Sequence, residues 1–142
     1  MLEILKNTFK RVQKLSSNKI LKDIFDDSDL RLDMVNLNRS QMRDDGVDAK
    51  GDSLGDYSPI SVSKYGKEAG HIQLYDTGYF QGSMKALSLK EAVVIEADMK
   101  KPDVDLEIIY PHALGLTDEN TKIIQGLVEP IFKEKVLQEV LQ

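Results

Sequence analysis

Apolar residues near both ends of the chain recur at three- and four-residue steps, which is the spacing of an amphipathic helix. In residues 2–15 the apolar positions are Leu2, Leu5, Phe9 and Val12. A polar interruption at 16–18 precedes a second short helix, whose apolar residues are Ile20, Leu21, Ile24 and Phe25. Residues 26–29, Asp-Asp-Ser-Asp, predict a helix stop and a new N-cap, because short polar side chains accept hydrogen bonds from free backbone N–H groups.

Residues 30–42 fit two patterns. Leu30, Met34 and Leu37 have helical spacing, whereas Leu30, Leu32 and Met34 alternate as in a strand. We expect a helix that ends near Gly46. Residues 44–56 contain three glycines among Asp and Ser, a composition typical of a loop.

The middle of the chain is expected to supply a sheet. Residues 57–63 predict a strand, with Pro59 at a sheet edge or a strand start, and residues 64–70 predict a mobile basic loop. Residues 71–75 predict a second short strand. Asp76-Thr77-Gly78 has turn chemistry, and residues 79–84 follow as one helical turn. Residues 84–89 and 92–97 give the clearest hairpin, joined by Lys90-Glu91.

The last part of the chain predicts a long helix. Residues 98–103 form a polar turn, and residues 106–110 fit either a strand or a short helix. Thr117 is the expected cap of the final helix, which Pro130 should kink or split. These elements predict an α+β fold with a helical N-terminus, a small mostly antiparallel sheet and a long C-terminal helix packed on the sheet. We expect a single domain over 1–142, divided into 1–28, 29–116 and 117–142.

Composition narrows the function classes. The chain has 142 residues, no Cys and two His, so disulfides and thiolate chemistry are excluded. No apolar run reaches the ~18 residues of a membrane span, and we expect no membrane contact. The net charge is −5, and residues 23–56 alone carry −6 from ten Asp and four basic side chains. A DNA-wrapping protein usually has a basic stripe instead, so this window argues against tight DNA binding and fits a solvated surface.

Each candidate catalytic or metal-binding motif in the sequence lacks a residue that its chemistry requires. Asp76-Thr77-Gly78 resembles an aspartic-protease motif, but those enzymes pair two such Asp, and the chain has no second copy. His71 and His112 have no Gly-x-Ser-x-Gly nucleophile elbow to serve. The Asp-rich loop around Gly51 lacks the ligand spacing of an EF-hand. We therefore expect no enzyme activity, no cofactor and no dedicated metal site.

Three ordered motifs resemble the bacteriophage virion-morphogenesis or tail-completion family of head–tail connectors, over about residues 37–130. The first is an aromatic-x-Pro segment with Tyr57 and Pro59, and the second is a Lys-rich loop with Lys64 and Lys67. The third combines Leu74, Asp76, Thr77, Gly78, Phe80 and Ser83. The chain departs from the family pattern after the hairpin, where Tyr110-Pro111-His112-Ala113 replaces the usual stretch.

The resemblance implies a non-enzymatic structural protein of the phage neck. It would be assembled in the host cytoplasm, form a homo-oligomeric ring in the virion and join the capsid portal complex or its adaptor to the tail. DNA would pass through the ring without specific binding, and a lumen-facing acidic surface of Asp44, Asp45, Asp48 and Asp52 would favour sliding. The alternative is a small adaptor or regulatory module that binds a partner through its terminal helices.

Overall fold

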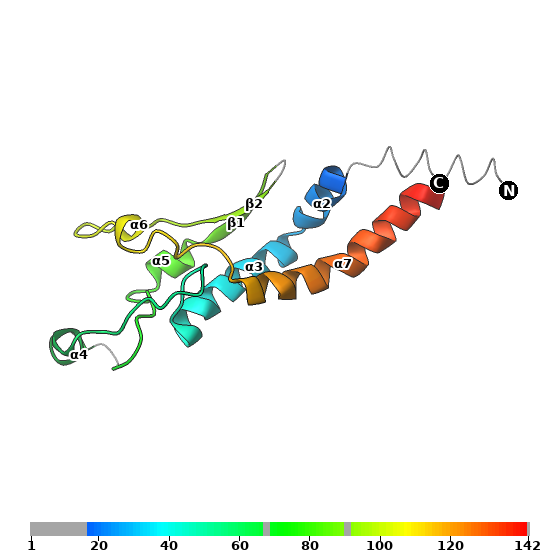
Figure 1. Ribbon diagram of the computed structural model, residues 1–142. Coiled ribbons are helices and arrows are strands. Elements are labelled where there is room, and N and C mark those ends of the chain that lie inside the picture. The colour runs from blue at the N-terminus through cyan, green and yellow to red at the C-terminus, as the bar shows by residue number, and fades with distance from the viewer. Residues whose placement is uncertain (1–16, 67–68, 90–91, 142) are drawn as a thin grey trace.

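The computed structural model describes residues 17–66, 69–89 and 92–141, and it is α+β as expected. The predicted helix over 2–15, the hairpin connection Lys90-Glu91 and the loop residue Lys67 lie outside the described residues. The elements in chain order are helices α2 (Ser17–Phe25) and α3 (Ser28–Ser40), the π-helical turn η1 (Gln41–Asp45), helices α4 (Pro59–Tyr65) and α5 (Tyr79–Gly82), strands β1 (Lys85–Ser88) and β2 (Val93–Glu96), and helices α6 (Leu106–Ile109) and α7 (Asp118–Leu141) (Figure 1).

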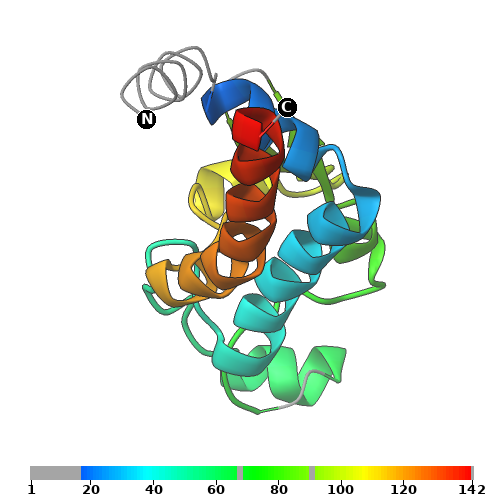
Figure 2. The same cartoon turned by 90° about the vertical axis from the view of Figure 1, so that its right-hand side faces the viewer.

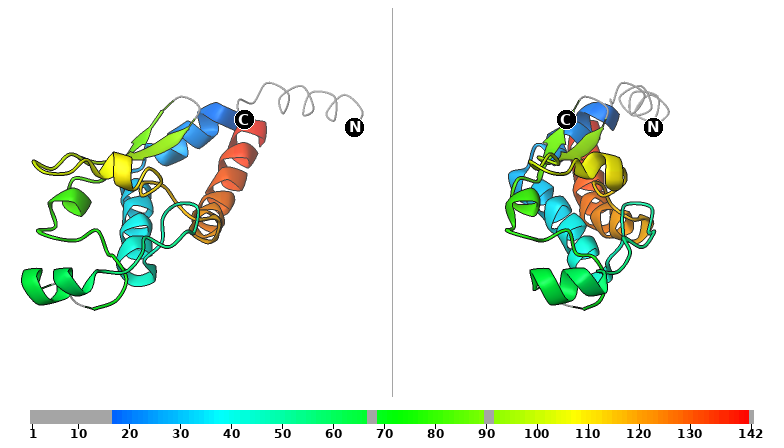
Figure 3. Two further views of the ribbon diagram at one scale, coloured as in Figure 1. Left: turned by 60° about the vertical axis from the view of Figure 1, so that its left-hand side comes forward. Right: turned by 90° about the vertical axis from the view of Figure 1, so that its left-hand side faces the viewer.

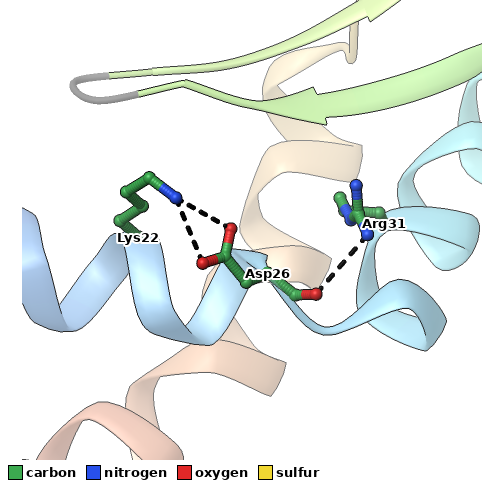
Figure 4. A network of polar contacts seen from close by, with 3 residues as sticks. All are labelled: Lys22, Asp26 and Arg31. Carbon is green, nitrogen blue, oxygen red and sulfur yellow. Dashed lines mark hydrogen bonds and ion pairs between the residues drawn. The ribbon is translucent and has the colours of Figure 1, made fainter.

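The junction between α2 and α3 confirms the predicted stop and cap. Asp27 is extended and its carboxylate accepts hydrogen bonds from the backbone N–H groups of Asp29 (2.8 Å) and Leu30 (3.3 Å). Figure 4 shows two further contacts at this junction: Lys22 Nζ lies 3.1 Å from the Asp26 carboxylate, and Arg31 Nη2 donates to the Asp26 carbonyl at 3.4 Å. The ion pair is exposed, so it adds little stability, and the cap is the main local signal for the turn.

The predicted helix through residues 30–42 is confirmed, and it ends as expected at Gly46. After α3 the backbone continues through η1, and Gly46 closes it in the left-handed region with φ 65°. A Cβ at Gly46 would lie 2.6 Å from the ring of His71. His71 Nε2 in turn lies 2.8 Å from the Arg43 carbonyl, so glycine lets the chain after η1 pack directly against the His71 loop.

The sheet is confined to one antiparallel hairpin. β1 pairs with β2 from Lys85 opposite Glu96 to Ser88 opposite Val93, as the pattern predicted, and β1 lies against α3. In the described residues, this two-stranded sheet is smaller than the sheet we expected.

The predicted strand over 57–63 is wrong, because this segment forms α4. Ser58 is an N-cap whose hydroxyl accepts from the N–H of Ser61 at 3.1 Å, and Pro59 occupies the first turn. Proline suits that position because its missing N–H has no helical partner there. The predicted loop over 64–70 is corrected too, since Lys64 and Tyr65 are the last residues of α4 and Gly66 is its left-handed cap.

The predicted strand over 71–75 is also wrong. His71 makes only an isolated bridge with Asp56, although the N–H of Ile72 also donates to the Gly55 carbonyl at 2.8 Å. Leu74 then enters the left-handed region with φ 53°, which ends any extended pairing. The ambiguous segment 106–110 is resolved as the short helix α6, capped by the Asp105 carboxylate.

α7 begins as predicted, because Thr117 Oγ1 accepts from the Asn120 N–H at 3.2 Å. Pro130 does not split the helix, which is continuous from Asp118 to Leu141. The apolar residues on both sides of Pro130 are anchored in one cluster, which offsets the lost backbone hydrogen bond. Buried Ile124 and Val128 precede it, and half-buried Phe132 and Val136 follow it.

The prediction that the C-terminal helix packs on the sheet is wrong, since α7 lies along α2 (Figures 1 and 2). Ile20 and Ile24 of α2 bury in the same cluster as Ile124 and Val128 of α7. The sheet reaches this cluster only through the half-buried side chains of Val93 and Ile95. α2 offers a helical apolar face of matching spacing, and a two-stranded hairpin is too narrow to cover a 24-residue helix.

Two apolar clusters share the hairpin. The first gathers buried side chains of α3, η1, α5, β1 and α6 with neighbouring loops, and its members are Val35, Met42, Leu54, Phe80, Met84, Ala86, Leu106 and Ala113. The second holds the helices together through Ile20, Ile24, Leu30, Met34, Ile124 and Val128. Val93 and Ile95 of β2 pack against both clusters, so the hairpin couples the helical layer to the irregular half of the molecule.

Asn38 and Gln41 fix the segment that leads into α7. Both side chains are almost fully buried, at 0% and 1% exposure. Asn38 donates to the carbonyl of Ala113 (3.0 Å) and accepts from the N–H of Gly115 (2.8 Å). Gln41 donates to the carbonyl of Gly115 (2.9 Å) and accepts from the N–H of Thr117 (2.9 Å). The Asn120 side chain also donates to Gln41 Oε1 at 2.9 Å.

We expect Gln41→Ala to reduce the free energy of unfolding by about 2–4 kcal/mol, because the backbone groups it satisfies would lose their partners in a buried site. Asn38→Ala should have a similar effect. Chemical denaturation followed by circular dichroism measures both. Asn36→Ala on the same helix is the matched control: Asn36 is exposed, and we expect a change within about 0.5 kcal/mol. Equal effects of Asn36→Ala and Asn38→Ala would contradict the assigned role of the buried pair.

Candidate functional site

The sequence motif that begins at Leu74 folds as a strained loop followed by α5. Leu74 has φ 53°, a conformation that costs a residue with a large side chain on the order of 1–3 kcal/mol. Gly78 is the N-cap of α5 with φ 84°, and a Cβ there would lie 2.9 Å from the Tyr75 hydroxyl. The turn chemistry predicted for Asp76-Thr77-Gly78 is confirmed, since Thr77 Oγ1 accepts from the Tyr79 N–H at 3.3 Å.

Gln81 holds the strained loop to the rest of the fold. Its buried side chain donates to the carbonyl of Gln73 at 2.8 Å and lies 3.4 Å from the carbonyl of Leu74. Its own backbone carbonyl accepts from Arg39 Nε of α3 at 2.9 Å. Buried Phe80, beside it, belongs to the first apolar cluster. Loop, α5 and α3 are therefore one connected unit, which explains how the Leu74 conformation is maintained.

Ser83 ties α5 to the end of the hairpin. Its hydroxyl donates to the Phe80 carbonyl at 2.7 Å and accepts from the Asp98 N–H at 2.9 Å. Tyr79 reinforces this link, because its hydroxyl donates to Asp98 Oδ2 at 2.9 Å. The hydrogen bond to the Asp98 carboxylate and its negative charge raise the pKa of Tyr79 above 10. Ser83 thus has a structural position in the fold.

Asp76 lies on the surface of this unit, with 61% of its side chain exposed. Its carboxylate is 4.0 Å from Lys101 Nζ, an exposed pair that contributes little to stability. An aspartic-protease carboxylate shares a proton with a second aspartate at close range. The environment of Asp76 is that of a solvated ion beside a lysine.

Only part of the two earlier motifs, the aromatic-x-Pro segment and the Lys-rich loop, lies next to the segment 74–83. Tyr57 is adjacent, because its hydroxyl oxygen accepts from the N–H of Gln73 at 3.3 Å, and its own N–H donates to the Gly70 carbonyl. Pro59 and Lys64 belong to α4, a separate helix at one end of the molecule (Figure 1). The predicted motif residues therefore fall into two groups: Tyr57 and the segment 74–83 lie together, whereas Pro59 and Lys64 lie apart on α4.

The four candidate acidic residues lie together around the turn that follows η1. Asp48 Oδ1 accepts from the N–H groups of Lys50 (2.9 Å) and Asp52 (3.0 Å), so Asp48 shapes the turn. The carboxylate of Asp44 accepts from the Ser40 hydroxyl at 2.6 Å. Asp44, Asp45 and Asp52 are exposed. In the described residues, no group of three or more acidic or histidine side chains is arranged to hold a metal ion.

The two histidines have separate positions. His71 contacts the Arg43 carbonyl through Nε2, and His112 is exposed while its backbone carbonyl accepts from the Ala49 N–H at 2.8 Å. Arg43 also stacks over the Tyr75 ring, 4.5 Å from its centroid, where a cation is attracted to the aromatic face. Both contacts join η1 to the strained loop and its neighbours.

α7 presents a second apolar face in addition to the one that it buries against α2. Five of its large apolar side chains are 42–79% exposed, and we call them the α7 outer face: Ile123, Leu127, Ile131, Leu137 and Leu141. Ile108 and Ile109 of α6 are exposed as well. The sequence carries a signal for this second face. The apolar residues of α7 occupy more of the helix surface than a single contact stripe needs, since they form both the α7 outer face and the buried face.

Asn38, Gln41 and Asp98 are further structural residues that the sequence patterns did not single out. Asn38 and Gln41 occur three positions apart among apolar residues of the helical stretch. Polar side chains inside an apolar stripe indicate buried hydrogen bonding, and this signal could have found them.

No family model, curated protein or solved structure matches this chain. In the part of the chain that the structure describes, no helix has the length and apolar content needed to cross a bilayer.

We expect Asp98→Asn to lower the pKa of Tyr79 toward 10, because the substitution removes the negative charge that disfavours the phenolate. In the native protein the hydrogen bond between Tyr79 and Asp98 stabilises the fold below pH 10. This contribution to the free energy of unfolding disappears as the pH rises through the raised pKa of Tyr79. Titration by NMR of ring-labelled tyrosine reads each residue separately. Tyr110 is the control, because burial raises its pKa and Asp98→Asn should leave it unchanged. An unmoved Tyr79 pKa would contradict the assignment.

Proposed function

We propose that this chain is a non-enzymatic structural subunit of a phage virion neck, a head–tail connector or tail-completion protein. In this proposal it forms a closed ring that joins the portal complex to the tail. The ordered motifs at Tyr57, Pro59 and the segment 74–83 support the family resemblance. Gln81 and Ser83 support a structural role for that segment, since both hold it to neighbouring elements.

The observation that carries the proposal is the exposed apolar surface of α6 and α7. Ile108 is 79% exposed, and the α7 outer face extends over most of the helix. Apolar surfaces of this kind on a water-soluble subunit mark contacts with other proteins. In a ring, each subunit uses one surface to contact a different surface on the next, and a suitable rotation closes the assembly.

The acidic turn has a role in this assembly. Asp44, Asp45 and Asp52 would face the lumen and repel DNA phosphates, so that the genome slides without binding. A small adaptor that binds a host partner through its terminal helices is the alternative, and the same exposed apolar face of α7 favours it.

We expect the purified protein to assemble into a closed ring, alone or on addition of phage portal or adaptor proteins. Native mass spectrometry and light scattering measure the subunit number directly. Leu127→Asp should prevent assembly, because it places a charge in the apolar contact, whereas Ile60→Asp on the exposed part of α4 should not. A persistent monomer that ignores every neck component but binds one host protein would favour the adaptor.

We expect the triple variant Asp44→Lys, Asp45→Lys, Asp52→Lys to slow DNA passage, because basic side chains in a lumen would bind phosphates. Asp48 is left intact, since it shapes the turn. Rates of DNA ejection from assembled particles provide the measurement. Asp23→Lys, an exposed acidic position on α2, serves as the charge control. Unchanged ejection and infectivity in the triple variant would contradict a lumenal position.

A further inference from the structure

A cavity of about 310 Å³ lies on the surface of the segment where α3 passes into η1. Its lining residues recur at steps of three and four, so they share one side of the segment, and they are Asn36, Arg39, Ser40, Arg43 and Asp44. Two of the four basic side chains of the acidic window 23–56 are among them. α5 lies beside α3 (Figures 1 and 3), and Arg39 contacts its backbone.

Arg39 is held in place by two hydrogen bonds. Its Nε donates to the carbonyl of Gln81 at 2.9 Å, and its Nη1 donates to Asn36 Oδ1 at 3.1 Å. In the part of the chain that the structure describes, its Nη2 has no acceptor. The guanidinium group is therefore fixed while it keeps N–H donors for a ligand, and a fixed side chain loses little conformational entropy on binding.

Arg43 is oriented by an aromatic ring. Its guanidinium carbon lies 4.5 Å from the centroid of the Tyr75 ring. A guanidinium group that stacks on a ring keeps its N–H donors in its own plane, where an acceptor can reach them. Within the described ranges, no oxygen accepts from these donors, and no carboxylate forms an ion pair with Arg43 or Arg39.

The backbone beside the cavity has two unusual features. η1 is a π-helical turn, a form that occurs mostly at functional sites. Leu74 has φ 53°, and strained residues of this kind cluster at active sites and ligand-binding sites. The π-helical turn carries Arg43, and Tyr75 directly follows Leu74, so both features contribute to the contact that orients Arg43.

The charges of the lining residues select the ligand. The two guanidinium groups and the Asp44 carboxylate give the cavity a net charge of +1. The Asp44 carboxylate accepts from the Ser40 hydroxyl at 2.6 Å, which holds it in the lining. A net charge of +1 matches a single carboxylate, whose two oxygens accept paired hydrogen bonds from a planar guanidinium group. The Asp44 carboxylate would repel a phosphate dianion more strongly.

We propose that Arg39 and Arg43 form a binding site for a carboxylate group. A small organic acid and a glutamate side chain of another protein present the same group, and the experiment below distinguishes these two sources. The proposal goes beyond the neck function and does not rest on it, because one chain supplies every residue of the site.

Titration of the full-length protein with butyrate tests the site. The Nε–H signals of arginine in the NMR spectrum of the ¹⁵N-labelled protein report each guanidinium group separately. We expect the signals of Arg39 and Arg43 to shift together and to saturate. Arg31 is the internal reference, because it donates to the Asp26 carbonyl and does not line this cavity.

A Gly-Glu-Gly peptide with blocked termini identifies the source of the carboxylate. The peptide and butyrate carry the same charge, so a difference in affinity reports what surrounds the carboxylate. Tighter binding of the peptide assigns the site to a glutamate side chain, and tighter binding of butyrate assigns it to a small acid.

Variants of the lining residues test the assigned roles. We expect Arg43→Gln to weaken butyrate binding roughly tenfold, because one charged donor group is lost. Arg43→Lys should recover only part of the affinity, since it keeps the charge without the paired donors. Asp44→Asn should strengthen binding roughly fivefold, because it removes a like charge beside the ligand. Asp45→Asn is the matched control, an exposed neighbour that does not line the cavity.

Circular dichroism checks that each variant is folded. Three results would each overturn the proposal: signals of Arg39 and Arg43 that shift no more than that of Arg31, an Arg43→Gln variant that binds like wild type, or inorganic phosphate that binds more tightly than butyrate at equal ionic strength. Ring assembly is measured separately by native mass spectrometry, so failure of the carboxylate site leaves the neck function standing or falling on its own result.

Discussion

The buried hydrogen bonds of Asn38 and Gln41 are the constraint on which the arrangement of this protein depends. They bind the backbone of residues 113–117, a segment more than seventy positions away that has no regular structure of its own. A buried backbone group without a partner costs about 1–3 kcal/mol, so these two side chains allow an irregular segment to cross the interior. Because Gln41 also reaches Asn120, they set where α7 begins.

The starting point of α7 determines which of its residues are buried. From Thr117 the helix extends along α2, and one apolar stripe closes the second cluster with Ile20 and Ile24. The outer face then remains in water over most of the helix. A small two-stranded hairpin and short helices leave the fold with little surface to cover a helix of this length. The surface available for assembly is thus a consequence of the same contacts that stabilise the monomer.

The conformation of the segment from Leu74 to Ser83 is maintained in a comparable way, by contacts with neighbouring elements. A left-handed leucine and a left-handed glycine are held by Gln81, Ser83 and the stacking of Arg43 on Tyr75. Strain of this kind persists only where surrounding contacts overdetermine it. The segment therefore connects α3, α5 and the hairpin through hydrogen bonds of side chains and loops. These contacts do the work that a larger sheet would do in joining the elements.

The sequence by itself determined the local elements: the caps at Asp27 and Thr117, the end of the helical stretch at Gly46, and the hairpin are all set by contacts between near neighbours in the chain. It misassigned residues 57–63, because alternating polarity outweighed two helix-start signals, the N-cap Ser58 and Pro59 in the first turn. Only the tertiary structure decided that α7 packs on α2, and that Asn38 and Gln41 bind the distant carbonyls of Ala113 and Gly115. Such contacts join residues that have no periodic relation along the chain, so no local pattern specifies them.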